Sequence, residues 1–518
     1  MSDSLDLSVR RANLSLTQRA MLQARLRGGH MTNAAQSITP RQPRSDRAPL
    51  SYAQQRQWFL WQMNPESTAY HMCGGLALTG HLDVDAIRAS LDALVARHDS
   101  LRTTFCADGE GVAEQIIHAR LDIRLPYFDL SDMSSDEKEV RLKDEIERRC
   151  AQPFDLTSGP LLRAALFKTE KDEHHLVVVM HHIVSDEWST QIILDEMATL
   201  YGAYVEGTSP QLPDSPIQYA DYAVWQRAWI NGVEGQRQLA WWRAQMGDEH
   251  PVLALPTNRS RAGDGGYAAA RHRIVLDAEL AGRLRQQAKA YGGTLFMALL
   301  TAFEALLFRH TGQADLRVGV PVANRNHSEV DKIVGIFVNA QVLRAKIDGR
   351  MPLAELLVQT RNVALGAQAN QDLPFERLVE ALQPERHLAT HPLFQVMFNH
   401  LRRDHRSLQT WLGLTVERLD FDESDAQFEL ALQTCEYEDG QIEASFSYAR
   451  ELFEPETIER MAGHYVAVLR ALADHPEQAV GEIDLLSDAE RRQLAAWGVN
   501  ERRYPDVEPV HRLIERRV

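Results

Sequence analysis

Residues 176–189, LVVVMHHIVSDEWS, lead from a run of apolar strand residues into two adjacent histidines and an aspartate. Imidazole is the commonest general base at neutral pH, so a histidine at the end of a buried strand is a candidate catalyst. Successive side chains of a strand point to opposite faces, so His181 and His182 diverge unless the strand ends between them. We therefore predict that only one of them enters a cleft, while the other is packed and hydrogen-bonded.

Two other interpretations of this stretch stay open at this point. A strand end with two satisfied histidines needs no function at all. A metal site is disfavoured, because adjacent histidines on an extended chain do not easily share one ion and no HExxH spacing is present. Asp186 lies beyond a tight turn, where its carboxylate can hold the histidine loop by pairing with an arginine.

Composition narrows the class of protein. The chain has 518 residues, 44% hydrophobic and 25% charged, which is ordinary for a globular protein of two to four lobes or domains. The net charge of −16 does not suggest a nucleic-acid partner. No apolar run approaches the roughly 18 residues of a membrane helix, and the N-terminus lacks the apolar core of a signal peptide. The four cysteines form no CxxC pair and fit a reducing cytosol, so we expect a soluble cytoplasmic protein; they are Cys73, Cys106, Cys150 and Cys435.

The periodicity predicts alternating strands and helices in two halves. Residues 84–98 form an amphipathic helix with Ile87, Leu91, Leu94 and Val95 on one face. The second half repeats this style, with apolar helices and strands such as DLRVGVPVAN and PLFQVMFNHL. We predict an α/β protein with mixed, α+β-type sheets, in two lobes with a cleft between them.

The first fifty residues differ from the rest of the chain. They contain eight Arg and no Lys against three Asp and no Glu, a local balance of +5. Helical spacing over residues 14–26 precedes a polar, Pro-containing linker. Two interpretations stay open: a solvated leader, or a basic helix that docks an acidic partner in trans.

Seven stretches together resemble one known family. MHHIVSDEWS resembles the HHxxxDG signature of the condensation domains of nonribosomal peptide synthetases, relatives of chloramphenicol acetyltransferase. The other motifs of that family have similar stretches here, in the same order between residue 50 and about residue 490. They are SYAQQRQWFL (51–60), RHDSLRTTF (97–105), YADYAVW (219–225), VGIFVNAQVLR (334–344), NQDLPFE (370–376) and, in part, HPLFQVMFNH (391–400).

The resemblance implies a fold and a set of partners. It implies two acetyltransferase-like lobes, residues 49–226 and 227–490, in a V-shaped pseudo-dimer with a central tunnel. Donor and acceptor substrates would arrive on the phosphopantetheine arms of carrier proteins, one recruited in trans by residues 1–48. No tightly bound cofactor, metal, nucleic acid or membrane is implied, and we expect a monomer. Residues 491–518 resemble the linker to an adenylation domain, so a free-standing enzyme and an excised piece of a synthetase both stay open.

The resemblance also implies roles for individual residues. His182, the second histidine of the motif, would take the proton from the attacking amine or hydroxyl, or orient that group and stabilise the tetrahedral intermediate. His181 would be structural. Asp186 would pair with an arginine, for which Arg97 is the first candidate and Arg102 the second.

Asn339 and the residues after Asp186 complete the predicted site. Asn339 matches a position near the tunnel centre that supports the site. Glu187 stands where the family has glycine, and it either turns to solvent or reshapes the acceptor side. Trp188 and Ser189 are further acceptor-side candidates. Four stretches look closer to the subtype of the family that accepts donors ending in a D-residue than to the all-L subtype. They are SYAQQRQWFLWQM, HHIVSDEWS, VGVPVANRN and PLFQVMFNH.

The sequence thus predicts an acyltransferase that forms an amide or an ester between carrier-bound substrates. Within the family, a starter domain that takes an acyl group from coenzyme A is the alternative. From another class, a catalytically silent carrier-docking module is the alternative, and Glu187 is its only hint.

Overall fold

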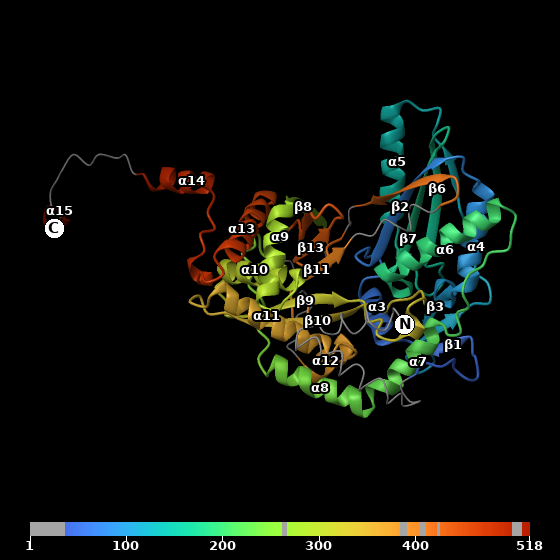
Figure 1. Ribbon diagram of the computed structural model, residues 1–518, viewed down its shortest axis with the longest axis horizontal. Coiled ribbons are helices and arrows are strands. Elements are labelled where there is room, and N and C mark those ends of the chain that lie inside the picture. Colours follow the sequence, from blue (N-terminus) through green and yellow to red (C-terminus); the bar gives the residue numbers. More distant parts are fainter. Residues whose placement is uncertain are drawn as a thin grey trace, which may run out of the picture.

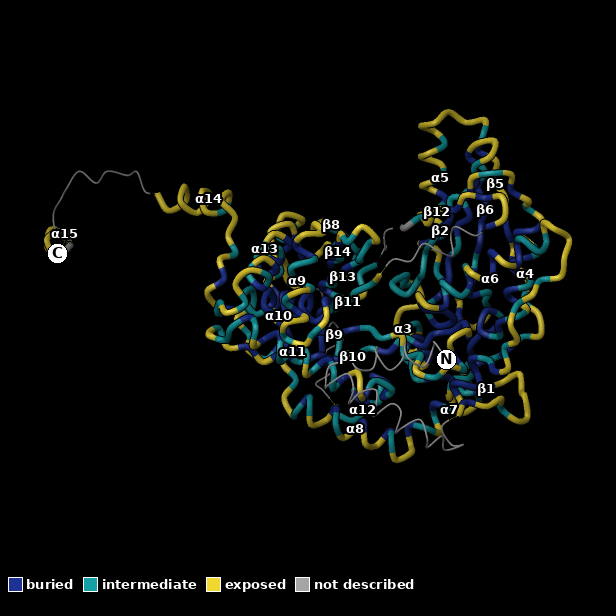
Figure 2. The backbone as a smooth tube through the Cα atoms, viewed as in Figure 1, coloured by how far each residue is buried: buried dark blue, intermediate teal, exposed yellow. Residues whose placement is uncertain are grey.

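The chain forms two lobes, each built on a mixed β-sheet with helices packed against it (Figure 1). The computed structural model describes residues 37–261, 267–383, 391–402, 411–421, 425–499 and 510–517. Most of the first half makes one lobe and most of the second half makes the other, and the two diverge as the arms of a V (Figure 1). The buried backbone runs through the sheets of both lobes, and α5 and α14 carry mostly exposed residues (Figure 2). The predicted fold class is confirmed.

The sheet of the first lobe has five strands in the order β12-β2-β7-β6-β5. Neighbouring strands are antiparallel except β5 and β6, which are parallel. Helices α4 and α6 cover one face, where Ile87, Leu176 and Ile193 share a core, and α5 lies against the other. The strands are β2 (His71–Gly80), β5 (Tyr127–Asp129), β6 (Leu162–Glu170), β7 (Glu173–His181) and β12 (Leu414–Asp420), and the helices are α4 (Val84–Arg97), α5 (Ser135–Cys150) and α6 (Glu187–Val205).

The sequence signals explain where these elements begin and end. Asp83 caps α4 by accepting a hydrogen bond from the N–H of Ala86, and the predicted apolar face of this helix is buried. The predicted helix over 190–206 begins earlier, at Glu187, because Asp186 serves as its N-cap. The cap therefore joins the histidine turn directly to a helix, which fixes the turn on both sides.

The sheet of the second lobe has six strands in the order β10-β9-β11-β13-β14-β8. β11 runs parallel to β9 and β13, and the other pairs are antiparallel. The strands are β8 (Ala269–Leu276), β9 (Asp315–Val322), β10 (Asn339–Lys346), β11 (Val396–Arg402), β13 (Leu430–Glu436) and β14 (Ile442–Ala449); the helices are α9 (Ala278–Ala290), α10 (Leu295–Thr311), α11 (Leu353–Gln368), α12 (Phe375–Leu382) and α13 (Pro455–Asp474).

Further elements connect the lobes or extend from them. A three-stranded sheet, β1-β4-β3, lies in the first lobe, and α14 and α15 lead away from the second (Figure 1). These elements are β1 (Arg47–Pro49), β3 (Thr103–Ala107), β4 (Ala113–Ile117), α3 (Tyr52–Met63), α7 (Tyr219–Ile230), α8 (Val233–Met246), α14 (Asp488–Gly498), α15 (Val510–Glu515) and the 3-10 turns η1 (Asp99–Arg102), η2 (His182–Val184), η3 (Ser328–Val330) and η5 (Val480–Glu482).

One strand of the second half joins the sheet of the first lobe. β12 pairs along β2 from Leu414 opposite Gly80 to Asp420 opposite Gly74. The sequence does not predict this crossover, because strand periodicity shows which residues share a face and not which strand they pair with. Sequence position alone therefore does not assign β12 to its lobe, and the ranges 49–226 and 227–490 stay a prediction.

The predicted N-terminal docking segment lies mostly outside the described residues, which begin at residue 37. The described end of that segment packs on the body: Ile38 is 3% exposed and shares an apolar cluster with Ile217 and Ile333. Arg41 forms an ion pair of 3.0 Å with Asp221. Residues 37–48 are therefore held against both halves of the chain.

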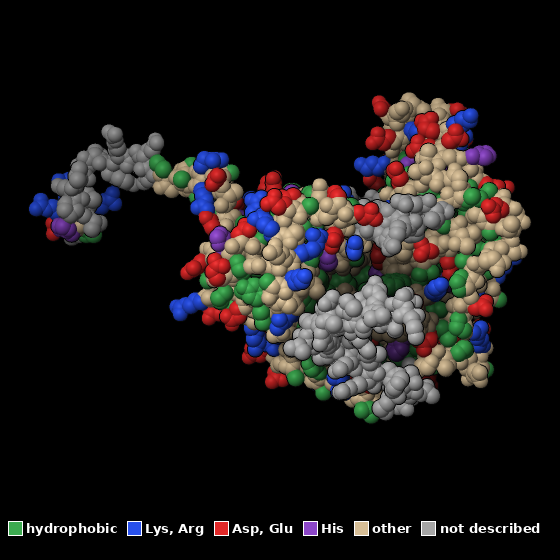
Figure 3. Space-filling model, in the orientation of Figure 1, with side chains coloured by type: hydrophobic (Ala, Val, Ile, Leu, Met, Phe, Trp, Pro, Cys, Tyr) green, Lys and Arg blue, Asp and Glu red, His purple; other side chains and the backbone are tan. Residues whose placement is uncertain are grey.

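Between residues 37 and 517, within the described ranges, no single helix is long and apolar enough to cross a membrane. Only α9 and α10 taken together meet the length and composition criteria, and they are bent by 98°. On the face drawn in Figure 3, acidic and basic side chains are interspersed over both lobes.

A buried carboxyl group in α10 makes the stability of the second lobe depend on pH. Glu304 is 1% exposed, and burial raises its pKa to about 8. Its hydrogen-bond partner is Thr360 Oγ1, 2.6 Å from Oε2, and the Thr360 hydroxyl also donates to the carbonyl of Leu356 at 3.0 Å. A hydroxyl has one proton to donate, so a protonated Glu304 satisfies both bonds.

We expect Glu304→Gln to remove part of this pH dependence. Unfolded glutamate releases its proton near pH 4.5, whereas the folded group keeps it to about pH 8. Between these values the folded state binds more protons, so its stability falls as the pH rises. From pH 5 to pH 7 the variant should gain about 3 kcal/mol relative to the parent chain, at about 1.4 kcal/mol per pH unit. Urea unfolding of both chains at pH 5 and at pH 7 measures this difference. If the free energy of unfolding changed equally in the two chains between these pH values, the prediction would be contradicted.

Candidate functional site

The strand β7 ends between the two adjacent histidines. His181 is its last residue, opposite His71 of β2, and His182 opens the 3-10 turn η2. The N–H of His182 donates to the carbonyl of Tyr70 at 2.9 Å, the last bond in register with β2. As a result, His182 lines a cavity of about 280 Å³, and His181 does not.

The ring of His182 is held in one tautomer. Its Nδ1 lies 2.8 Å from the backbone carbonyl oxygen of Ser185. A carbonyl only accepts, so Nδ1 carries the proton and Nε2 presents a lone pair. Within the described ranges, Nε2 has no hydrogen-bond partner. The turn therefore presents an imidazole that is ready to accept a proton in a cavity.

His181 has a different environment. It is 4% exposed, and its Nδ1 accepts a hydrogen bond from the N–H of Ile183 at 3.1 Å. Its ring packs near those of Phe154 and His71, with centroids 6.0 and 6.1 Å away. Burial holds the pKa of His181 well below its usual value. This histidine is a neutral packing residue that fixes the end of the strand.

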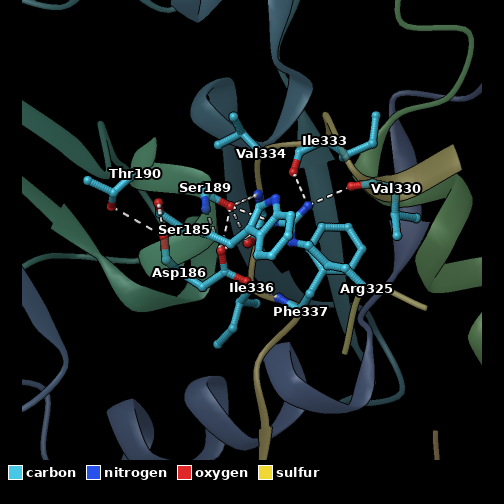
Figure 4. Close-up of polar contacts among 12 residues, drawn as sticks. Ser185, Asp186, Ser189, Thr190, Arg325, Val330, Ile333, Val334, Ile336 and Phe337 are labelled. Atoms are coloured by element: carbon cyan, nitrogen blue, oxygen red, sulfur yellow. Dashed lines mark hydrogen bonds and ion pairs between the residues drawn. The ribbon is translucent and has the colours of Figure 1, made fainter. Parts of the chain in front are cut away.

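Asp186 ties the histidine turn to the second half of the chain (Figure 4). The carboxylate is 3% exposed; its Oδ1 accepts from the N–H and the hydroxyl of Ser189, both at 2.7 Å. Arg325 donates to Oδ1 at 3.2 Å, and the N–H of Phe337 donates to Oδ2 at 2.9 Å. One buried carboxylate thus caps α6 and holds two segments from the other half.

The predicted pairing of this aspartate with Arg97 or Arg102 is wrong. Arg97 forms an ion pair of 3.1 Å with Glu196, and Arg102 pairs with Asp99 on the neighbouring turn. The actual partner, Arg325, has a side chain that is only 1% exposed. Arg97 ends α4 and pairs with a carboxylate of α6, whereas Arg102 pairs within its own turn η1.

Sequence reasoning missed Arg325 because nothing local distinguishes it. It follows β9 in VPVANRN, a stretch with no motif of its own. Its guanidinium also donates to the carbonyls of Val330 and Ile333, at 2.6 and 2.8 Å. A charged residue three positions after the end of a buried strand is a weak signal, and many arginines share it.

Three further predicted residues, Asn339, Trp188 and Ser189, do not line the cavity of His182. Asn339 is 8% exposed, and its amide donates to the carbonyls of residues 371 and 373, which holds the NQDLPFE loop. Trp188 is 47% exposed and donates through Nε1 to the carbonyl of Asp331. Ser189 is fully buried, and its hydroxyl lies between Asp186 and the backbone of Gly335.

The cavity lies between the face of the first sheet and α6, and its rim is charged. Glu187 and Arg418, from α6 and β12, line it together with Arg271 and Asp425. Asp425 and the nearby Gln427 hydrogen-bond to the chain at residues 68–69, so the second half contributes to the rim. The apolar wall consists of Met72, Leu76, Leu176, Val178, Met180, Ile193 and Leu194.

Glu187, at the position of the family glycine, forms an ion pair of 2.9 Å with Arg418. The two side chains are 56% and 34% exposed and both line the cavity. Glu187 therefore does not simply turn to solvent: it spans part of the rim toward the crossover strand.

We expect Glu187→Gly to widen the rim of the cavity. In the acyl transfer that the family resemblance implies, turnover of acceptors with bulky side chains should rise relative to small ones. The free energy of unfolding should change by less than about 1 kcal/mol, because the pair is exposed. Arg418→Met is the matched control, since it removes the ion pair but keeps most of the bulk. An unchanged ratio of kcat/KM between bulky and small acceptors in Glu187→Gly would contradict the expectation.

In the described part of the chain, no three His, Cys, Asp or Glu side chains are grouped so that they could hold a metal ion. The cysteines at the cavity, Cys73 and Cys150, form no disulfide within the described residues. Arg163 lies near them, and burial lowers its pKa to about 10, so it stays charged at neutral pH. Burial also lowers the pKa of His71.

Known proteins resemble this chain along most of its length. Residues 44–495 match the family described as Condensation domain. A component of the linear gramicidin synthase of Brevibacillus parabrevis is 42% identical over 473 residues, which cover 91% of this chain and 6% of the relative. Malpibaldin synthetase of Mortierella alpina is 37% identical over 484 residues, covering 93% of this chain and 9% of the relative. The chain thus spans less than a tenth of the length of these relatives.

A solved structure of a complex of the X-domain and OxyB from teicoplanin biosynthesis has a similar fold. Its matching chain is 27% identical with a TM-score of 0.78, over 87% of this chain and 98% of that one. The similarity covers both lobes, and it agrees with the arrangement of sheets described above.

Proposed function

The chain belongs to the condensation domain family of nonribosomal peptide synthetases, and from that premise we propose that it transfers an acyl group between carrier proteins. The donor would be a thioester on a carrier's phosphopantetheine arm, and the acceptor an amine or a hydroxyl on a second carrier. The observation that carries the proposal is the lone pair of His182 Nε2 in the cavity of about 280 Å³.

The reaction has a simple proton balance. The acceptor nitrogen or oxygen attacks the thioester carbonyl carbon, a C–N or C–O bond forms, and the C–S bond breaks. His182 Nε2 receives the proton of the attacking group and passes it to the departing thiolate. The carbonyl of Ser185 holds the ring in line, and it stabilises the imidazolium because it accepts from Nδ1.

Asp186 and Arg325 are proposed as positioning residues. They make no contact with the cavity, but they fix η2 and the start of α6 against the second lobe. His181 fixes the strand end in the same way, and Asn339 supports the NQDLPFE loop.

The terminal segments belong to the same proposal. Residues 1–48 would recruit one carrier in trans. The first fifty residues have a charge balance of +5, which favours an acidic partner. Residues 491–518 would be linker of the kind that leads to an adenylation domain. Leu494 and Trp497 of α14 are 49% and 73% exposed, as expected of a helix whose apolar side faces another domain.

Two other functions have specific support. The apolar wall of the cavity fits an alkyl chain, which a starter domain would take from coenzyme A. The similarity to an X-domain solved in a complex with OxyB supports a module that binds a partner protein. Glu187 in place of glycine fits the second alternative, whereas the free Nε2 of His182 favours catalysis.

Parallel donors separate these functions. The chain is incubated with an aminoacyl acceptor carrier and with the same acyl group on a donor carrier or on coenzyme A. Intact-mass spectrometry of the acceptor carrier then reports transfer. Transfer from the carrier supports the proposal, transfer from coenzyme A alone supports the starter function, and no transfer from either, with carrier binding retained, supports recruitment. The new bond is then tested with mild base after the product has been released from the acceptor carrier. An amide stays intact, whereas an ester is hydrolysed.

A further inference from the structure

A second cavity, of about 110 Å³, lies on the sheet of the second lobe. Besides Gln427, four uncharged polar side chains from three adjacent strands line it: Asn399 of β11, Gln433 of β13, and Ser445 and Ser447 of β14. In the register of the sheet, Asn399 lies opposite Gln433, and Gln433 lies opposite Ser445. These three residues therefore form one polar row across the strands, and Ser447 lies on the same face two residues further on.

The composition of this face differs from that of the opposite face. Phe398 and Phe446 alternate with these polar residues along β11 and β14, and both are completely buried in the core. Phe398 packs against Phe303 of α10 with ring centroids 6.0 Å apart. The polar face is thus not needed for the core of the lobe, which the other side of the same strands supplies.

The polar groups are not satisfied by the protein. Ser445 is 6% exposed, and its Oγ has no hydrogen-bond partner among the described residues. Gln433 is exposed and Asn399 and Ser447 are half-buried, and their side chains make no hydrogen bond within the described part of the chain. Buried polar groups in proteins are almost always paired, so a buried hydroxyl that points into a cavity without a protein partner indicates a ligand or water there.

The second cavity adjoins the cavity of His182. Arg271 and Gln427 line both of them. Gln427 also donates to the carbonyl of Ala69, at the rim of the first cavity. A chain attached to a group that reacts at His182 can therefore extend past these two residues onto the polar face.

We propose that Asn399, Gln433, Ser445 and Ser447 form a subsite that hydrogen-bonds an amide group of the substrate. Asn and Gln side chains each donate and accept, as a peptide amide does, and serine hydroxyls do both as well. The space corresponds to about four water molecules, enough for one such group. An alkyl chain in the same place would leave these polar groups unpaired, so the subsite selects against it. This inference rests on the proposed function, and it assigns specificity to a face that lies outside the catalytic turn.

The amide can belong to the donor or to the acceptor, and two arms of one experiment distinguish them. In the donor arm, one carrier bears an N-acetylglycyl or a pentanoyl thioester, which have the same main-chain length. In the acceptor arm, the donor is fixed and the acceptor carrier bears an asparaginyl or a leucyl group, which are nearly isosteric. Competition between each pair, followed by intact mass, gives the preference of the parent chain and of Ser445→Ala and Gln433→Leu.

We expect each variant to lower kcat/KM for the amide-bearing substrate by about threefold to tenfold in one arm, the loss of one hydrogen bond. Turnover of the alkyl substrate should stay unchanged, which a general folding defect would not allow. Gln441→Leu is the matched control, because Gln441 is an exposed glutamine just before β14 and lies outside both cavities.

The outcomes separate the two proposals. If the parent chain, both variants and the control all transfer with the same preference for the amide-bearing over the alkyl substrate, this result overturns the subsite and leaves the proposed function in place. A parent chain that transfers neither donor group and acylates neither acceptor overturns the proposed function, and the subsite with it.

Discussion

Replacing Arg325 with methionine is expected to lower the free energy of unfolding by about 3–5 kcal/mol, the usual effect of removing one partner of a buried ion pair. The variant leaves the carboxylate of Asp186 buried at 3% exposure without its cation. It also leaves the carbonyl of Ile333 without the Arg325 donor, and the carbonyl of Val330 with the N–H of Ile333 alone. Both losses fall on the segment that joins the histidine turn to the second lobe.

Chemical unfolding in urea measures the effect of Arg325→Met. Arg259→Met is the matched control, because Arg259 pairs with Glu454 on the surface, with side chains 58% and 45% exposed, and its loss should cost at most about 1 kcal/mol. A double-mutant cycle with Asp186→Asn isolates the coupling of the pair. Equal losses in Arg325→Met and Arg259→Met would contradict the assignment of Arg325 as the structural partner.

Replacing His182 with alanine is expected to lower the rate of acyl transfer by about 10²- to 10⁴-fold, the usual contribution of a positioned general base. The variant removes the one group that we propose takes a proton from the acceptor. It leaves Asp186, Arg325 and the buried His181 in place, so the fold should be retained.

Two measurements make the His182→Ala result specific. His81→Ala is the matched control, since His81 is an exposed histidine of the same lobe and should keep the full rate. The urea midpoint and the affinity for the carriers should be unchanged in His182→Ala. A variant that folds, binds carriers and transfers at the parent rate would refute the role of this imidazole.

Local patterns predicted the elements that the fold requires. The apolar face of 84–98 and the alternation of 176–181 each reflect which side of one element is buried, and this information is present in the sequence itself. The ends of elements were less certain, as at α6, where the N-cap lies in the motif and not before the helical run. The pairing of β12 with β2 was not predictable, because partners are chosen by the tertiary fold.

The candidate site, like the fold, was predictable from the sequence only in part. The divergence of His181 and His182 follows from strand geometry, and the structure shows the strand ending between them. The partner of Asp186 does not follow from any local rule, since Arg325 lies 139 residues further along the chain. Polar residues of β11, β13 and β14 were likewise unremarkable in sequence, because only the register of the sheet brings them into one row.

The most direct test of acyl transfer at His182 is a single-turnover measurement with two loaded carrier proteins and an excess of the chain. We predict that the acyl mass leaves the donor carrier and reaches the acceptor carrier with one time course, and that His182→Ala slows both changes equally. Persistence of both starting masses with the parent chain, although both carriers bind to it, would contradict acyl transfer by this protein.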